Sequence, residues 1–160
     1  YPLSLERMAF YVEEETNDNG VVTLSTLPDG EVDVLVSAGG YGVTLLSKLS
    51  VGPGSPEVFR GELKPENVLV VTVQDSSKAP LSDVSLHAIS IQDGPSIMSG
   101  VVNALGPRRS ALKSGADGRI TVGALAAGLY VMEFSKGPQR QQLKVKIEDG
   151  KPHRATLTMQ

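Results

Sequence analysis

The chain has 160 residues, of which 40% are hydrophobic and 21% are charged, and its formal net charge is −3. This balance is typical of a globular protein and excludes a disordered chain, which would be richer in charge and poorer in apolar side chains. No apolar run approaches the roughly 20 residues that a membrane-spanning helix needs, so we expect no direct membrane insertion. Cysteine is absent, which excludes a disulfide framework.

The net charge conceals a difference between two parts of the chain. Residues 1–74 hold 4 basic and 11 acidic side chains, a net charge of −7, whereas residues 75–160 hold 11 basic and 7 acidic side chains, a net charge of +4. Opposite charges attract only over short distances in physiological salt. Weak self-association is therefore one prediction, and two independently solvated surfaces are the simpler alternative.

Taken in chain order, the first segments with strand character precede residue 64. Apolar residues at 8–12, alternation at Val32, Val34 and Val36, and a final segment at 58–63 predict short strands. Turns are expected at Asn19-Gly20 and at Gly30, because Asn-Gly and Asp-Gly pairs supply the positive φ angles of tight turns. We assign residues 1–63 to a first domain, which is truncated or borrows a strand from a longer parent chain because little sequence precedes residues 8–12.

A linker at 64–66 leads to a second and more complete domain at 67–160. Its expected strands are an apolar run at 67–73, a segment at 84–91, and later segments in which apolar and polar residues alternate, such as Leu143, Val145 and Ile147. Clean alternation is typical of antiparallel strands that are buried on one face. Further turns are expected at Asp117-Gly118 and at Gly128.

The two domains share a repeated pattern. Residues 16–60 align without a gap on residues 114–158, at an offset that places Gly20 on Gly118 and Gly30 on Gly128. Self-similarity at a fixed offset indicates that one supersecondary unit was used twice. The repeat predicts architecture and says almost nothing about chemistry.

Residues 92–113 form an insertion that the first domain lacks. A long segment of this kind is either functional or part of the fold, here as an extra edge hairpin, and both interpretations stay open. As a binding loop it would offer apolar anchors with a basic rim, and the candidate partner-binding residues are Ile97, Met98, Val101, Leu105, Arg108 and Arg109.

The second domain resembles a known family in the run from Ser114 through Asp117-Gly118 and Leu125 to Gly128 and Tyr130. This pattern is similar to that of the carboxypeptidase regulatory-like domain, a transthyretin-like Greek-key sandwich of seven strands. The resemblance covers about two-thirds of the chain, and the second copy has Ala126 where the family usually has proline. It implies accessory modules of secreted or membrane-anchored proteins, without catalytic residues of their own.

No motif indicates catalysis, a metal or a cofactor. Only two histidines occur, His87 and His153, and alternation places both on outer faces, whereas zinc sites usually need three or four ligands. The acidic run 13–15 with Asp18 lacks the spacing of a calcium loop, and a solvated turn explains it more simply. The acidic net charge and the shortage of aromatic side chains argue against nucleic-acid binding.

The sequence therefore predicts an all-β protein of two tandem Greek-key sandwiches, transthyretin-like or Ig-like, with the first incomplete. The predicted role is a non-enzymatic structural or interaction module of a larger extracytoplasmic protein (secreted, cell-surface, periplasmic or in an organelle lumen). It would space neighbouring domains and bind other domains of its parent or another protein. The alternative is a carbohydrate-binding accessory domain of a secreted or surface enzyme.

Overall fold

The computed structural model describes residues 12–25, 27–54 and 58–160. Of the strand predicted at 8–12, all but Val12 lies outside the described residues. The elements in chain order are β1 (Gly30–Val36), β2 (Thr44–Val51), β3 (Asn67–Gln74), β4 (Ser85–Ile91), α1 (Met98–Leu105), the 3-10 helix η1 (Gly106–Leu112), β5 (Arg119–Leu125), β6 (Gly128–Lys136), β7 (Gln139–Ile147) and β8 (His153–Thr158).

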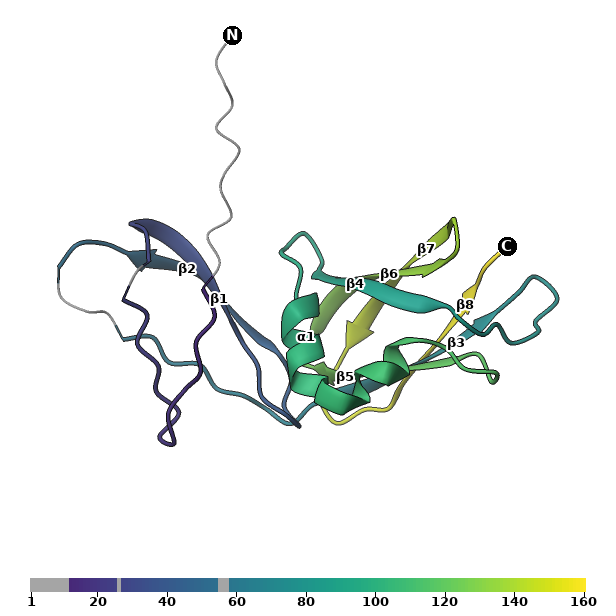
Figure 1. The fold of residues 1–160 in the computed structure, drawn as a ribbon, viewed down its shortest axis with the longest axis horizontal. Coiled ribbons are helices and arrows are strands. Elements are labelled where there is room, and N and C mark those ends of the chain that lie inside the picture. Colours follow the sequence, from purple (N-terminus) through teal and green to yellow (C-terminus); the bar gives the residue numbers. More distant parts are fainter. Residues whose placement is uncertain (1–11, 26, 55–57) are drawn as a thin grey trace, which may run out of the picture.

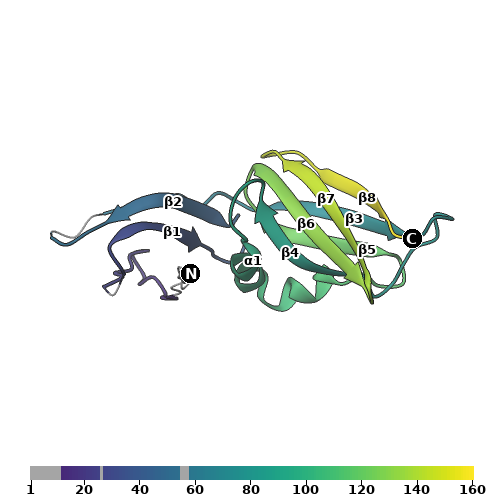
Figure 2. The same cartoon turned by 90° about the horizontal axis from the view of Figure 1, so that it is seen from above.

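Residues 67–160 form a β-sandwich of two three-stranded sheets (Figures 1 and 2). One sheet has the strand order β5-β3-β8 and the other has the order β4-β6-β7. The core lies between them and is filled by alternate residues of each strand, among them Leu69, Val71, Ile120, Met132 and Phe134, which have no exposed surface. The predicted all-β sandwich fold is confirmed, and its cause is the period-two burial of apolar side chains.

The sheets have different patterns of pairing. Strand β3 is central in its sheet, where it pairs antiparallel with β5 and parallel with β8. Strand β6 is central in the other sheet and pairs antiparallel with both β4 and β7. The parallel pair brings together segments from the two ends of the sandwich sequence, so the sheet is complete only when β8 is in place.

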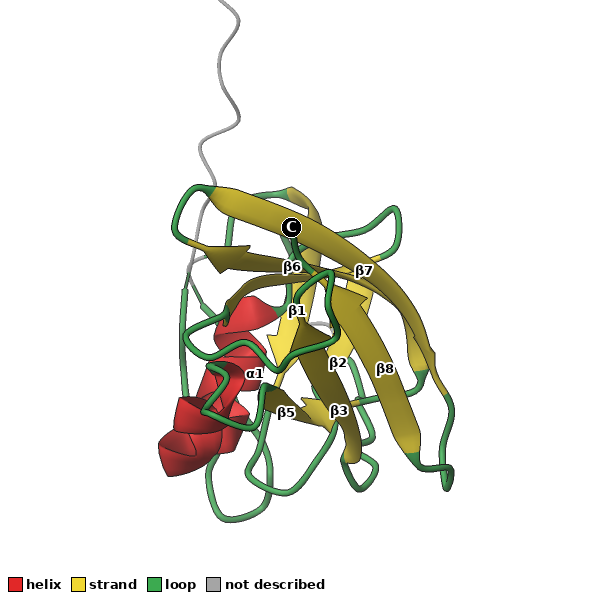
Figure 3. Ribbon diagram, turned by 90° about the vertical axis from the view of Figure 1, so that its right-hand side faces the viewer, coloured by secondary structure: helices red, strands yellow, loops and turns green. Residues whose placement is uncertain are grey.

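The insertion at 92–113 is neither a loop nor an edge hairpin, because it contains α1 and η1. These helices lie along one side of the sandwich (Figure 3), where α1 packs against β4 and β5. Ile97, Val101, Ala104 and Leu105 recur at helical spacing and all are buried. The segment therefore closes the side of the sandwich where the free edges of β4 and β5 would otherwise meet water.

The first part of the chain is a single hairpin, β1–β2, within the described residues. Val32 lies opposite Leu49 and Val34 lies opposite Leu46, so apolar residues share one face. Every one of these four side chains is only partly buried. The strand expected at 58–63 is not formed: these residues have no regular structure, and Val58 is 83% exposed. Among the strands of the described residues, none pairs with this segment, so its apolar residues gain no cross-strand packing by becoming extended.

The repeat is reproduced in part. At the offset seen in the sequence, β1 corresponds to β6 and β2 corresponds to the second half of β7, so each copy contains one hairpin. Residues 21–25, which align with β5, form no strand. Gly30 has a φ of 126°, whereas Gly128 begins β6 with φ outside the left-handed region, so these two glycines do not occupy equivalent turns. The predicted turns at Gly20 and Gly118 do have positive φ, 74° and 70°.

Candidate functional site

The structure separates the six candidate partner-binding residues. Ile97, Val101 and Leu105 are at most 4% exposed and belong to the core, which corrects their assignment as surface anchors. Met98 is partly buried against the same core, and Arg108 is held by an ion pair. Arg109 is exposed. The apolar residues of this segment therefore contribute to folding rather than to a solvent-facing patch.

Arg108 forms an ion pair with Glu66. Arg108 Nη1 and Nη2 donate to Glu66 Oε1 and Oε2 at 2.7 and 3.1 Å, a two-point contact that fixes both planar groups. The backbone N–H of Ala124 donates to the same carboxylate at 2.7 Å. The hydrogen bond from Arg108 holds the pKa of Glu66 below its ordinary value, so the carboxylate is charged at neutral pH.

Glu66 lies at a junction between the hairpin and the sandwich. The loop after β1 reaches the sandwich through Val43, which is 3% exposed and whose N–H donates to the carbonyl of Ala124 at 2.8 Å. Ala124 has a φ of 58°, unusual for a residue with a side chain. The N–H of Ala124 thus donates to Glu66, and its carbonyl accepts from the N–H of Val43. The strained conformation persists because the junction holds it.

The hairpin and the sandwich are also closely packed at the junction. A Cβ atom added to Gly42 would lie 2.7 Å from the backbone nitrogen of Ala126, and one added to Gly100 of α1 would lie 2.7 Å from Leu35. The expected linker does not behave as a free connection either, because the Lys64 carbonyl accepts from Gly42 N–H at 2.9 Å. Residues 64–66 therefore contact both the hairpin loop and the sandwich and couple the two. Figure 1 shows that α1 also lies between the hairpin and the sandwich.

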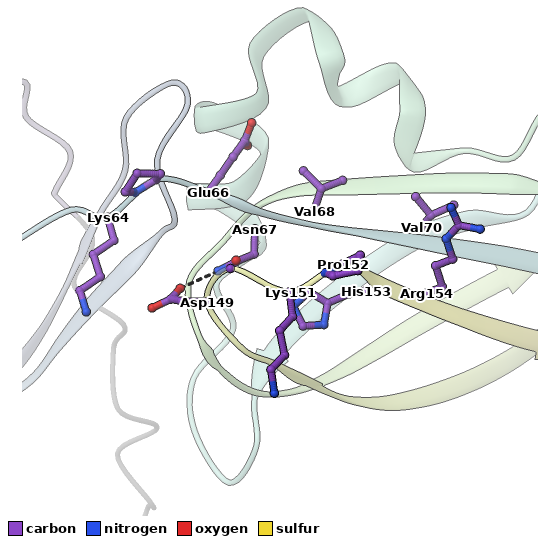
Figure 4. A pocket seen from close by; sticks show the side chains of 12 residues that line it. Lys64, Glu66, Asn67, Val68, Val70, Asp149, Lys151, Pro152, His153 and Arg154 are labelled. Carbon is purple, nitrogen blue, oxygen red and sulfur yellow. Dashed lines mark hydrogen bonds between the residues drawn. The ribbon is translucent and has the colours of Figure 1, made fainter.

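An open groove runs beside this junction, between the start of β3 and the turn before β8 (Figure 4). Lys64, Val68, Val70, Lys151 and Arg154 are among the residues that line it. Its buried amide, that of Asn67, is already satisfied: Nδ2 donates to the Leu125 carbonyl at 3.2 Å and to Asp149 Oδ1 at 2.9 Å. The groove thus combines cations, the carboxylates of Glu66 and Asp149 and a short apolar strip. Its buried amide is already bonded and is not available to select a small ligand.

The two histidines lie on different sheets. His87 Nε2 is 3.3 Å from Glu133 Oε2, and His153 Nε2 lies 2.8 Å from the Glu148 carbonyl. Within the described ranges, no group of three or more His, Cys, Asp or Glu residues has the arrangement of a metal site. No helix in that part of the chain is long and apolar enough to cross a membrane.

These features define the chain as an all-β protein with a sandwich and a docked hairpin. No family model and no curated protein matches it. The resemblance to the carboxypeptidase regulatory-like family predicted a β-sandwich, and the structure has one. Membership of that family stays a prediction, because no family model matches.

Limited similarity exists to solved structures of pilins. The minor pilin of Streptococcus agalactiae is 18% identical at a TM-score of 0.44, over 90% of this chain and 65% of that one. A streptococcal ancillary pilin is 14% identical at a TM-score of 0.43, over 83% and 45%. The major pilin subunit BcpA of Bacillus cereus is 13% identical at a TM-score of 0.40, over 59% and 28%. The chain thus spans less than two thirds of each of these proteins.

Proposed function

We propose that the chain is a non-enzymatic structural module of a larger extracytoplasmic protein. In this role it holds the segments on either side of it at a defined separation and orientation. The observation that carries the proposal is the junction at Glu66, where an ion pair, two backbone hydrogen bonds of Ala124 and a buried valine connect the hairpin to the sandwich. A flexible spacer would need none of these contacts, since a Gly- or Ser-rich linker suffices.

The shape of the molecule supports the same role. The hairpin lies at one end of the long axis and the C-terminus of β8 lies toward the other (Figure 1). The carbohydrate-binding alternative gains no support, because Tyr41 and Phe59 are the exposed aromatic residues of the described chain and come from different segments. Sugar-binding surfaces usually rely on grouped aromatic platforms.

The test is a distance distribution between the hairpin and the sandwich. The chain has no cysteine, so Ser50→Cys and Thr156→Cys introduce two spin labels at exposed positions on β2 and β8 without competing sites. A rigid module gives a narrow distribution by pulsed electron resonance. Glu66→Ala should broaden it, and Lys48→Ala, an exposed change in the same hairpin, should not. A broad distribution in the otherwise unaltered chain would rule out the spacer role.

A further inference from the structure

The first unit of the repeat exposes apolar side chains at positions that the second unit buries. At the offset of the repeat, Val22 corresponds to Ile120 and Phe59 corresponds to Leu157. Ile120 and Leu157 are at most 4% exposed, whereas Val22 is 40% exposed and Phe59 is 43% exposed. The first unit therefore has the same apolar positions without the packing that covers them.

The strand that covers these positions in the second unit is β3. It is the central strand of its sheet and lies between β5 and β8. Val71 lies opposite Ile120 of β5, and Val73 lies opposite Leu157 of β8. Without β3, the inner residues of both neighbouring strands would lose the side chains beside them and one layer of their cover.

The first unit has counterparts of β5 and β8 and none of β3. Residues 21–25 correspond to β5 and residues 58–60 correspond to the end of β8, and neither segment forms a strand. Strand β3 ends at Gln74, whereas Tyr1 corresponds to Ser99, so this sequence holds no counterpart of β3. The two segments thus correspond to the neighbours of an absent central strand.

The arrangement in space agrees with this correspondence. Figure 1 shows residues 12–25 and the segment after 57 on the same side of the hairpin β1–β2. A Cβ atom added to Gly61 would lie 3.4 Å from Leu46 of β2, whereas residues 12–25 lie on the β1 side of the hairpin in Figure 2. Val34 of β1 is only partly buried, although its counterpart Met132 has no exposed surface.

We propose that residues 21–25 and 58–60 form a strand-acceptor site, into which an extended segment of another polypeptide chain inserts. The added strand runs antiparallel to the first segment and parallel to the second, as β3 does with β5 and β8. Main-chain hydrogen bonds and burial of alternate side chains supply the affinity of such a contact. This inference does not depend on the spacer role.

The chemistry of the partner follows from β3 and from the charge of the site. Strand β3 has no charged residue and buries its side chains at alternate positions. The described residues between 12 and 63 hold eight acidic and two basic side chains, a formal net charge of −6, which favours a partner strand with basic flanks. Residues 1–11 of this chain correspond to 99–109, which belong to α1 and η1 and not to β3, so the repeat favours a strand from another chain.

The experiment measures the binding of a peptide to the full chain by fluorescence anisotropy. The probe is the sequence of β3, Asn67–Gln74, with two lysines at each end and a fluorescent label. We expect saturable binding. The same peptide with Val71→Pro should not bind, because proline lacks the N–H that a central strand must donate.

Two pairs of substitutions locate the site on the protein. Val22→Lys with Phe59→Lys should weaken binding of the probe by about tenfold or more, because both side chains would be covered by the added strand. The matched control is Val68→Lys with Leu129→Lys, which adds the same charge at sandwich positions that are 38% and 48% exposed and should leave binding intact. Equal loss in the two pairs, or no loss in the first, would overturn the proposal. Circular dichroism of every variant verifies the fold.

A disulfide test determines the orientation, since the chain has no cysteine of its own. Arg60 corresponds to Thr158, which lies opposite Gln74. A probe with Gln74→Cys should therefore form a disulfide with the Arg60→Cys chain, and a probe with Asn67→Cys should not; the reverse result would contradict the parallel orientation.

A chain that lacks residues 1–11 tests the source of the strand. The full chain and the shortened chain should both bind the probe. Binding by the shortened chain alone would assign the site to the chain's own first residues, and binding by neither would leave no acceptor site; each result would overturn the proposal. None of these results bears on the distance distribution that tests the spacer role.

Discussion

Replacement of Glu66 by alanine tests whether the carboxylate holds the junction through the backbone or through its ion pair. Glu66 accepts from the N–H of Ala124 at 2.7 Å, at a residue whose φ is 58°. An N–H that loses its acceptor in a partly buried site costs about 1–3 kcal/mol. The ion pair adds less, because Arg108 is half exposed and exposed pairs are screened.

The comparison requires three variants and one assay. We expect Glu66→Ala to lower the free energy of unfolding, measured by urea denaturation at neutral pH, by about 2 kcal/mol. Glu66→Gln retains an acceptor for Ala124 and should lose less. Arg108→Met removes only the ion pair and should lose least. If Arg108→Met costs as much as Glu66→Ala, the charge and not the backbone acceptor holds the junction, and the reasoning is wrong.

Acid provides an independent check on the same group. The pKa of Glu66 is lower in the folded state than in the unfolded chain, chiefly through the hydrogen bond from Arg108. The contribution of the Glu66 carboxylate to the free energy of unfolding is therefore complete above the ordinary carboxyl pKa. It disappears as pH falls through the lowered pKa of the folded state. The difference in stability between the unaltered chain and Glu66→Gln should shrink over this acidic range.

Three other measurements test the core, a buried tyrosine and a turn. Ile97→Ala should cost about 2–5 kcal/mol in urea denaturation because Ile97 is 1% exposed, whereas Arg109→Ala should change stability little. Burial raises the pKa of Tyr130 to about 12. The contribution of the neutral phenol to the free energy of unfolding is therefore complete below pH 10 and is lost as pH rises toward 12. The titration midpoint is measured from tyrosinate absorbance, as the difference between the parent chain and Tyr130→Phe. Gly118→Ala should lower the free energy of unfolding by more than about 1 kcal/mol, because φ is 70° and a Cβ would lie 2.5 Å from the Val73 carbonyl oxygen. Gly128→Ala should lower it clearly less. Equal losses of stability would contradict the assigned conformations.

The sequence predicts the sandwich strands well because their burial is local information. In β7, for example, Leu143, Val145 and Ile147 alternate with polar residues, and only one face of such a strand can enter a core. The same reasoning wrongly predicts a strand at 58–63. The apolar pattern there does not show whether another strand is available to pair with the segment. It also misses α1, whose buried stripe is only two turns long and begins directly after a glycine–proline break.

The junction could not be predicted from sequence because its partners are distant along the chain. Glu66 and Arg108 are separated by 42 positions, and nothing in the sequence near Glu66 signals a buried acceptor. The conformation of Ala124 has no local cause either, since alanine ordinarily avoids positive φ. Three-dimensional contacts decide both features, the Glu66–Arg108 pair and the conformation of Ala124. By contrast, the charge difference between residues 1–74 and residues 75–160 is visible in the composition alone.

The parallel pairing of β3 with β8 has a mechanical consequence. Because the two strands run in the same direction, β3 begins at one end of their ladder and β8 finishes at the other. Tension applied at Asn67 and Thr158 would pull them in opposite directions along their length, loading every hydrogen bond between Leu69 and Gln74 in shear at once. An antiparallel hairpin pulled at its open end breaks one bond at a time. A chain stretched between neighbours would therefore resist extension through its first and last sandwich strands.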